Sequence, residues 1–244
     1  MTKFLIIRFS SIGDIIQCMG IIGGIREKYP DAEIHWITRK DMASVLAMDS
    51  RIHKIWQVDK SKGVRELLKT GRSLKKEHFD YIYDAHNNLR SCILKRQLRP
   101  FWKRRTHLVC RSKERIKRFL LFRFGINRFD WPFRSMESYR KPLSRWGIVH
   151  FPDNEPERSF PADFNKRLAP LIGKETVTLV PSANWEMKRW PVSHWQELVR
   201  LLPEYRFIIL AGAGDHFCKE IHAVAPERVL NLTGKTNLLE SSYL

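Results

Sequence analysis

Apolar positions along the chain follow two alternating periods. Short runs of branched apolar residues, typical of buried parallel strands, precede stretches in which apolar residues return every three or four positions, as in helices packed on a sheet. The first example is KFLIIRFSSIGDIIQCMGII, in which residues 4–7 form the run and residues 12–22 carry the helical spacing. This alternation predicts an α/β protein with doubly wound parallel sheets.

The predicted strands fall into two groups. FLII, AEIHWIT, HKIWQVD, FDYIYDAH and HLVC lie in the first half of the chain, and TVTLV, RFIIL and RVLNL lie near its end. Helical spacing predicts helices between them, at about 41–47, 64–76, 89–98 and 113–124. In the second group, Ser193 and Gln196 form a capping box that predicts a helix start, and a further helix is predicted from about Asn237.

A Pro-rich stretch separates the two groups. Between residues 131 and 173 the periodic pattern disappears, and FPDNEPERSFPADFNKRLAP is typical of a connecting segment. We therefore expect a Rossmann-like first domain over residues 1–150, a linker over 151–173, and a smaller Rossmann-like domain over 174–244.

Composition narrows the class of protein. No apolar run approaches the roughly 20 residues that span a bilayer, and Arg8 and Asp14 interrupt the N-terminal apolar stretch, so we expect no signal peptide. The four cysteines are scattered, which favours reduced thiols and a cytoplasmic protein. Cys218 and His222 share a predicted helical face near Asp215, so a metal site there is an open alternative.

The chain carries a net charge of +18, and the excess is concentrated. Between Arg90 and Arg145 there are only three acidic residues, Glu114, Asp130 and Glu137, and aromatic residues are interleaved with the basic ones. Such a segment favours an anionic partner: nucleic acid, an anionic membrane surface or a phosphorylated substrate. An ordinary solvated basic face is the alternative.

Asp14 occupies the turn after the first predicted strand, where α/β proteins bind ligands. Phosphate-binding turns contain several glycines, whereas this turn has only Gly13, and the Asp14 carboxylate would repel a phosphate. This helix end is therefore poorly suited to phosphate, and a chemical role for the Asp14 carboxylate stays open at this point. The alternative is that an acid in the first helical turn only complements the helix dipole, worth about 0.3–1 kcal/mol.

The loop after TVTLV has the opposite character. It carries Ser182, Asn184, Lys188 and Arg189 just before a predicted helix N-terminus, an arrangement that suits a phosphate. Taken alone, Lys188 is better explained as an exposed loop lysine. The GAGD and GKT turns further along are weak signals by themselves.

An ordered set of motifs resembles a known family. IIRFSSIGDIIQ, YDAHNNLRS, PSANWEMKRWP, LAGAGD and NLTGKTNL together resemble the ADP-heptose:lipopolysaccharide heptosyltransferases of glycosyltransferase family 9. The resemblance implies a GT-B fold with two Rossmann-like domains, and an inverting transfer of heptose from ADP-heptose to the lipopolysaccharide inner core. Family members continue for about another hundred residues, so we expect the second domain to be incomplete.

The resemblance also implies roles for individual residues. Asp14 matches the catalytic base, and the reaction requires no metal or other cofactor. The family has a Gln-Gly pair where this chain has His86 and Asn87, which leaves acceptor contacts there open. The implied donor-binding residues are Lys188, Ser182, Asn184, Gly212 and Asp215, and the implied acceptor-binding residues are Ser10, Ser11, Gly13, His86 and Arg90.

The implied partners are a nucleotide-sugar donor, a phosphorylated lipopolysaccharide core acceptor and an anionic membrane surface, without nucleic acid. The expected location is cytoplasmic, peripheral on the inner leaflet of the inner membrane. Two alternatives remain: a non-catalytic basic module that binds nucleic acid or anionic membrane, and a truncated, inactive homologue.

Overall fold

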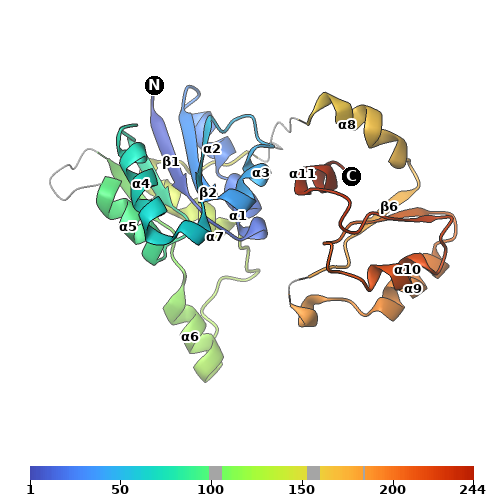
Figure 1. Ribbon diagram of the computed structural model, residues 1–244. Helices are drawn as coiled ribbons and strands as arrows, with labels where there is room; N and C mark the ends of the chain where they lie inside the picture. Colours follow the sequence, from blue (N-terminus) through green and yellow to red (C-terminus); the bar gives the residue numbers. More distant parts are fainter. Residues whose placement is uncertain (99–105, 153–159, 184) are drawn as a thin grey trace. The chain divides into compact units, whose positions relative to one another are not determined.

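The computed structural model describes residues 1–98, 106–152, 160–183 and 185–244. The chain forms two compact units, Met1–Ser159 and Phe160–Leu244 (Figure 1). Each unit contains a parallel sheet flanked by helices, which confirms the predicted α/β class with two Rossmann-like sheets.

The first unit is built on a five-stranded parallel sheet in the order β3-β2-β1-β4-β5. The first strand lies at its centre, and its Phe4 is paired with Ile34 on one side and Tyr81 on the other. Each predicted strand of the first group is present. The strands are β1 (Lys3–Ile7), β2 (Glu33–Arg39), β3 (Lys54–Val58), β4 (Tyr81–Asp84) and β5 (His107–Cys110).

The helices between these strands cover both faces of the sheet. Leu5 and Ile7 of β1 belong to a buried cluster with residues of α4 and α5, whereas Phe4 packs on Tyr29 and Trp146. The alternation of side chains along β1 thus supplies both layers of the core. The helices are α1 (Ile12–Met19), α2 (Ile22–Lys28), α3 (Ala43–Leu46), α4 (Gly63–Lys75) and α5 (Leu89–Leu98).

Two features of the first unit differ from the sequence-based expectation. The single helix expected over residues 12–22 is interrupted after α1, and a Cβ at Gly20 would come within 3.2 Å of the Met136 sulfur. The stretch after 131 is not without structure, because α7 (Glu137–Arg140) and a 3₁₀ helix over Lys141–Trp146 follow α6 (Arg115–Phe124). Tyr139 is fully buried there, and the Tyr83 hydroxyl donates to its carbonyl oxygen at 2.9 Å.

The second unit contains a three-stranded parallel sheet in the order β6-β7-β8. Its core joins Val199, Phe207, Ile209 and Ile221, which are 1% exposed or less. The strands are β6 (Thr176–Leu179), β7 (Arg206–Ile209) and β8 (Val229–Asn231), and the helices are α8 (Ala162–Arg167), α9 (Val192–Leu201), α10 (Cys218–His222) and α11 (Leu238–Tyr243).

One helix start is predicted correctly and the other is not. α9 begins at Val192 after Pro191, so Ser193 already lies inside the helix, and the predicted capping box of Ser193 and Gln196 is wrong. Proline at this boundary supplies the turn into the helix instead. Asn237 caps α11, because its side chain accepts from the Glu240 N–H at 2.9 Å and the Glu240 carboxylate accepts from the Asn237 N–H at 2.8 Å.

The expected linker over 151–173 overlaps the second unit. Helix α8 lies inside this range, and Phe164 in it is buried against Tyr243 of α11, with ring centroids 5.7 Å apart. Within the residues that the structure describes, no helix combines the length and apolar character needed to cross a membrane.

The core of the second unit gives a direct test of its packing. We expect Ile209→Ala, at a fully buried position of β7, to lower the free energy of unfolding by about 2–5 kcal/mol, because the lost methyl groups leave a cavity. The matched control is Leu230→Ala in β8, where the side chain is 39% exposed, and the expected loss is below about 1 kcal/mol. Urea denaturation measures both; equal losses would contradict the burial described for β7.

Candidate functional site

The carboxyl ends of three neighbouring strands bring the main candidate site of the first unit together. β1, β4 and β5 are adjacent in the sheet and end at Ile7, Asp84 and Cys110. Because parallel strands end at one edge, the residues that follow them lie close together, which is where α/β folds bind ligands. These residues include Arg8 and Arg111.

Asp14 is the third residue of α1, and its carboxylate closes the turn that starts the helix. Its Oδ2 atom accepts from the Ser11 hydroxyl at 2.9 Å and from the Ser11 backbone N–H at 3.4 Å. An acid at this position also complements the positive helix N-terminus. Asp14 therefore does complement the helix dipole, as the sequence-based alternative stated, but this role accounts for only some of its contacts.

A buried cation holds the same carboxylate. The Arg8 side chain is 7% exposed, and its Nη2 atom lies 2.6 Å from Asp14 Oδ2. Its Nη1 atom donates to the Ala85 carbonyl oxygen at 2.8 Å. A guanidinium this deeply buried needs a counterion, because an uncompensated buried charge is strongly destabilising. Asp14 supplies that charge while its own side chain stays 37% exposed.

Tyr139 and Arg111 complete the surroundings of Asp14. The Tyr139 hydroxyl donates to Asp14 Oδ1 at 2.7 Å. The Arg111 guanidinium lies 3.7 Å from the centre of the Tyr139 ring, and its Nη1 atom is 4.0 Å from Asp14 Oδ1. Because both carboxylate oxygens have donors, the side chain is fixed in one orientation.

These contacts set the protonation of Asp14. Burial alone would raise its pKa, but the hydrogen bond from Tyr139, the Arg8 charge and the hydrogen bonds from Ser11 outweigh it, so the pKa of Asp14 is held below its ordinary value. The carboxylate is therefore ionised at neutral pH. It is a weak base that is always available to accept a proton.

His86 lies near the residues around Asp14, and a buried acid, Asp84, holds its backbone in place. Asp84 is fully buried at the end of β4, forms an ion pair with Lys95 at 2.7 Å, and accepts from the backbone N–H groups of His86 and Asn87. Burial, followed by the charges of Arg8 and Lys113, lowers the pKa of His86 to about 4. His86 is thus neutral at neutral pH and interacts as a hydrogen-bonding imidazole.

The remaining residues predicted for the acceptor are distributed around this edge. Ser10 is partly exposed, and Gly13 faces open space at the start of α1. Arg90 does not join the Asp14 cluster but lines a separate cavity of about 70 Å³. That cavity also has Phe9, Arg39, Val58, Asp59, Lys60, Gly63, Val64 and Leu67 in its wall.

In the second unit, the Asp215 carboxylate connects the loop that follows β6 with the loop that follows β7 by hydrogen bonds. Its Oδ2 atom accepts from the Ser182 hydroxyl at 2.7 Å and from the Gly212 N–H at 2.9 Å. Arg189 Nη2 lies 3.8 Å from Oδ1. The structure therefore brings together three residues predicted for the donor, namely Ser182, Gly212 and Asp215, at the carboxyl ends of β6 and β7.

A cavity of about 370 Å³ lies next to these loops. Of the predicted donor residues, Asp215 contributes to its wall, whereas Lys188 is exposed on a 3₁₀ turn (Glu186–Lys188) and is not part of that wall. Asn184 lies outside the described residues. The wall is formed by Ala213, Asp215, His216, Lys219, His222, Leu230, Asn231, Thr233 and Lys235.

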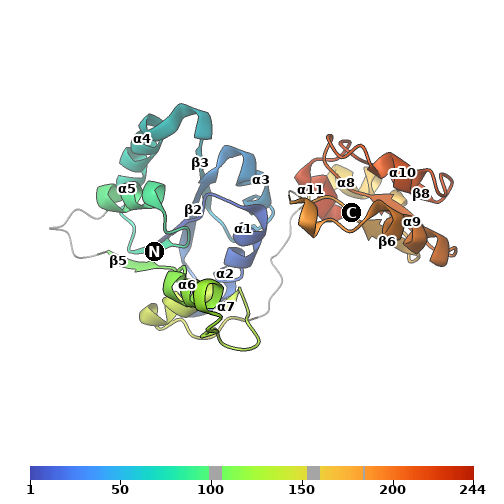
Figure 2. The same ribbon diagram turned by 90° about the horizontal axis from the view of Figure 1, so that it is seen from below.

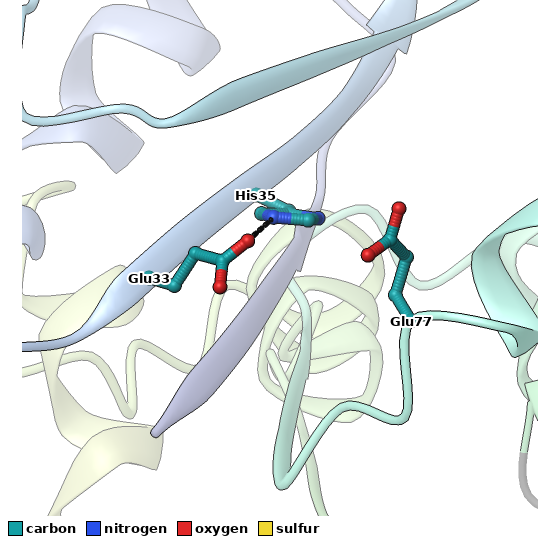
Figure 3. A group of neighbouring side chains, drawn as sticks. All are labelled: Glu33, His35 and Glu77. Atoms are coloured by element: carbon teal, nitrogen blue, oxygen red, sulfur yellow. Dashed lines mark hydrogen bonds and ion pairs between the residues drawn. The ribbon is translucent and has the colours of Figure 1, made fainter. Parts of the chain in front are cut away.

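One group of side chains in the described residues has the spacing of metal ligands: Glu33, His35 and Glu77 (Figure 3). Its atoms are already engaged with the protein. His35 Nε2 contacts Glu33 at 2.7 Å, and the Trp56 indole N–H donates to His35 Nδ1 at 3.2 Å. Lys54 forms an ion pair with Glu77 at 2.7 Å. We assign this group as a charge network at the amino ends of the strands, away from Asp14.

The metal alternative at Cys218 and His222 is not supported by their surroundings. Cys218 is fully buried in the core, where burial raises the pKa of its thiol. His222 Nδ1 donates to the Val229 carbonyl oxygen at 2.6 Å. Neither side chain belongs to a group with metal-ligand spacing in the part of the chain that the structure describes.

Sequence reasoning missed two residues that hold Asp14. Arg8 was noted only as an interruption of the apolar run, although a charge directly after a buried strand is a usable signal. Tyr139 is 125 positions from Asp14, so no local pattern could have connected the two. In the second unit the lysines Lys219 and Lys235 of the cavity wall were also missed.

Comparison with known proteins identifies relatives of the chain. Residues 67–244, more than half of the chain, match the model of glycosyltransferase family 9 (heptosyltransferase). A lipopolysaccharide core heptosyltransferase, OpsX of Haemophilus influenzae, is 30% identical over 89 residues, which are 36% of this chain and 25% of that protein. The chain thus matches about a quarter of the length of this curated relative.

Solved structures show the same fold. ADP-heptose lps heptosyltransferase II of E. coli has a TM-score of 0.72 and 20% identity, with 98% of this chain and 75% of that chain covered. Heptosyltransferase WaaC of E. coli, solved with ADP, has a TM-score of 0.67 and 18% identity, with 97% and 76% covered. At these identities the similarity establishes the fold and not the chemistry.

The contacts of Asp14 predict the response of its pKa to mutation. Tyr139→Phe removes the hydroxyl that donates to Oδ1 but keeps the ring on which Arg111 lies, so we expect the pKa of Asp14 to rise toward its ordinary value. NMR titration of the side-chain carboxyl carbons measures this change. The matched control is Tyr81→Phe, because the hydroxyl of Tyr81 contacts Tyr29 and not Asp14. This variant should leave the Asp14 titration unchanged.

The same pKa predicts how acid affects stability. Because the folded-state pKa of Asp14 is lowered, its ionised form adds stability above the ordinary Asp pKa, and this contribution disappears as pH falls through the folded-state value. Tyr139→Phe should therefore cost stability at neutral pH and little below the folded-state pKa of Asp14. An equal loss of stability at both pH values would contradict the assigned hydrogen bond.

Proposed function

The chain belongs to glycosyltransferase family 9, the heptosyltransferases, and on that premise we propose that it transfers heptose from ADP-heptose to the inner core of lipopolysaccharide with inversion at the anomeric carbon. The proposal draws on relatives described as lipopolysaccharide heptosyltransferases and on solved relatives bound to ADP. The acceptor is a Kdo or heptose sugar of the lipid A-linked core.

The observation that carries the proposal is the fixed, ionised carboxylate of Asp14 at the carboxyl edge of the first sheet. Arg8 and Tyr139 orient it, and the Tyr139 hydrogen bond together with the Arg8 charge keeps it ionised. Its side chain remains partly exposed. A purely structural acid would need none of this accessibility, whereas a general base must reach the proton it accepts.

In the proposed reaction, the acceptor hydroxyl oxygen attacks the anomeric carbon of the donor from the face opposite ADP. The bond between that carbon and the phosphate oxygen breaks, and its electron pair leaves with ADP. The hydroxyl proton passes to Asp14. A base of low pKa suffices because the attacking oxygen becomes strongly acidic as its bond to carbon forms.

Arg8 has a defined task in this step. When Asp14 accepts the proton, the ion pair with Arg8 loses its negative partner, which leaves a buried positive charge next to a neutral acid. The resulting imbalance favours rapid return of the proton to solvent. Arg8 therefore both orients the base and restores its ionised form for the next turnover.

The acceptor contacts we propose lie on the same edge of the first sheet. His86 is neutral and can exchange hydrogen bonds with sugar hydroxyls, while Arg90 in its separate cavity supplies positive charge for an acceptor phosphate. Ser10, Ser11 and Gly13 form the adjoining turn before α1, where the open space at Gly13 admits a sugar ring.

On the donor side, we propose that the second unit binds the ADP group. Cations in and near its cavity, among them Lys219 and Lys235, would stabilise the charge that develops on the leaving diphosphate. Exposed Lys188 would approach the phosphates from the loop before α9, with Ser182, Gly212 and Asp215 shaping the adjoining turns. Protein cations would thus replace a metal ion, and no cofactor is needed.

The lipid-linked acceptor sets the location that we propose. A sugar attached to lipid A stays at the membrane, so the protein would work on the cytoplasmic side, at the inner leaflet of the inner membrane. The basic character of the chain, with net charge +18, supports attraction to that anionic surface. Nucleic acid is not required by this function.

Asp14→Asn tests the proposed base. The variant keeps the size of the side chain but cannot accept the proton, so we expect sugar transfer to fall by about 100-fold or more. Release of ADP and formation of the heptosylated acceptor are measured together, with purified ADP-heptose and a heptose-deficient core acceptor. Binding of ADP-heptose, measured by calorimetry, should stay within about twofold of the parent, since the change lies in the first unit.

Asp41→Asn is the matched control. Asp41 is an exposed acid of the first unit that pairs with Arg39, and its replacement should leave the transfer rate unchanged. Circular dichroism verifies that both variants are folded. A parental transfer rate in Asp14→Asn would refute the assignment of Asp14 as the base. Loss of transfer in both variants would show that the effect is not specific to Asp14.

A further inference from the structure

Helix α6 is an unusual helix for a water-soluble surface. Its sequence, RIKRFLLFRF, consists of apolar and basic residues only, and none of its residues is buried. Figure 1 shows it projecting from the first unit between the chain that leaves β5 and the chain that leads to α7, and Figure 2 shows it from below, in front of that unit. A helix this apolar is stable when its apolar side chains are covered by another surface.

The apolar side chains continue beyond the helix. Phe122 is 84% exposed and Trp131, in the following loop, is 89% exposed. An open groove of about 330 Å³ runs between α6 and this loop and is lined mainly by apolar residues. We call residues 115–134 the α6 segment; its exposed large apolar residues are Ile116, Phe119, Phe122, Phe124, Ile126, Trp131 and Phe133.

The charge of the α6 segment is strongly positive. Asp130 is its only acidic residue, and Lys117 forms an ion pair with Glu114 just before the helix, at 3.6 Å. Basic residues are therefore interspersed with the exposed apolar ones and would meet negative groups on the surface that covers the segment. They are Arg115, Lys117, Arg118, Arg123, Arg128 and Arg134.

We propose that the α6 segment docks the protein on an anionic phospholipid bilayer, with its Phe, Leu, Ile and Trp side chains among the acyl chains and its basic side chains at the headgroups. Interfacial helices have this combination of Lys and Arg with Phe, Leu and Trp. At ten residues, α6 is about 15 Å long and lies in the interface, since a spanning helix needs about 20 residues.

The composition of the segment favours a bilayer over nucleic acid. Aromatic rings can stack on bases, but the aliphatic side chains Ile116, Leu121 and Ile126 cannot, and they gain free energy only by leaving water. Phe and Leu also lack the polar groups that read base edges. An anionic lipid surface accommodates the exposed apolar and basic side chains of the segment.

The α6 segment follows closely after a residue of the Asp14 site, so its contact with a membrane would affect where that site lies. Arg111, which lies 4.0 Å from Asp14, is only four positions before the start of α6, so membrane docking would bring the Asp14 edge of the sheet toward the lipid surface. This orientation rests on the proposed function, in which the acceptor is lipid-linked. The docking itself does not depend on sugar transfer.

Vesicle co-sedimentation of the whole chain tests the proposal. The vesicles contain phosphatidylcholine alone or mixed with phosphatidylglycerol, and we expect binding to the anionic vesicles that weakens as salt is raised. The double variant Phe119→Ser and Phe122→Ser should lower the affinity by at least about tenfold. The double variant Arg118→Glu and Arg123→Glu should do the same for anionic vesicles.

Controls separate the segment from general surface effects. Val149→Ser removes an apolar side chain of similar exposure, 76%, elsewhere in the first unit, and Arg72→Glu with Lys75→Glu reverses two exposed charges on α4; both should bind vesicles like the parent. Since α6 buries no side chain, the α6 variants should keep the parent melting temperature.

Several outcomes would overturn the proposal. These are no vesicle binding by the folded parent, equal binding by parent and α6 variants, and loss of self-association or of oligonucleotide binding in the α6 variants while vesicle binding persists. Transfer to a water-soluble acceptor fragment should be unchanged in the Phe119 and Phe122 double variant. This result distinguishes a failure of docking from a failure of the proposed transfer reaction.

Discussion

The ion pair between Arg8 and Asp14 connects the parts of the first unit on which its site depends. Arg8 follows the central strand directly, and Asp14 lies in the first turn of the helix that returns from it. Burying the guanidinium is favourable only with a counterion nearby, so the pair fixes the path of the chain between β1 and α1. The same pair keeps a carboxylate ionised at an accessible edge, which is the property that the proposed chemistry uses.

Much of the fold could be predicted because it follows from local patterns. Apolar runs and helical spacing located the strands of both sheets, since buried parallel strands are apolar throughout. The split between α1 and α2 was not predicted, because the apolar spacing continues across it from Met19 to Ile22. The helices after residue 131 were missed although Tyr139, Leu143 and Trp146 recur at helical spacing, because the run is short and Pro142 lies within it.

The candidate sites likewise contain some residues that the sequence indicates and others that only the structure reveals. Asp14 was predictable as a candidate because an acid in a glycine-poor turn after a strand is unusual, although its catalytic role stays a prediction. Tyr139 and Arg111, which orient it, come from residues separated from Asp14 by long stretches of chain. In the second unit, Ser182, Gly212 and Asp215 proved to be neighbours, whereas the cavity wall added His216, Lys219 and Lys235, for which the sequence offered only weak turn motifs.

The central claim is that the chain performs an inverting sugar transfer driven by protein groups alone. The most direct test is a transfer reaction in the presence of EDTA, with ADP-heptose of known anomeric configuration and NMR analysis of the glycosidic linkage formed. The account predicts one ADP released for each heptose transferred and a product with the opposite anomeric configuration. Retention of configuration, or a strict requirement for a divalent metal, would contradict it.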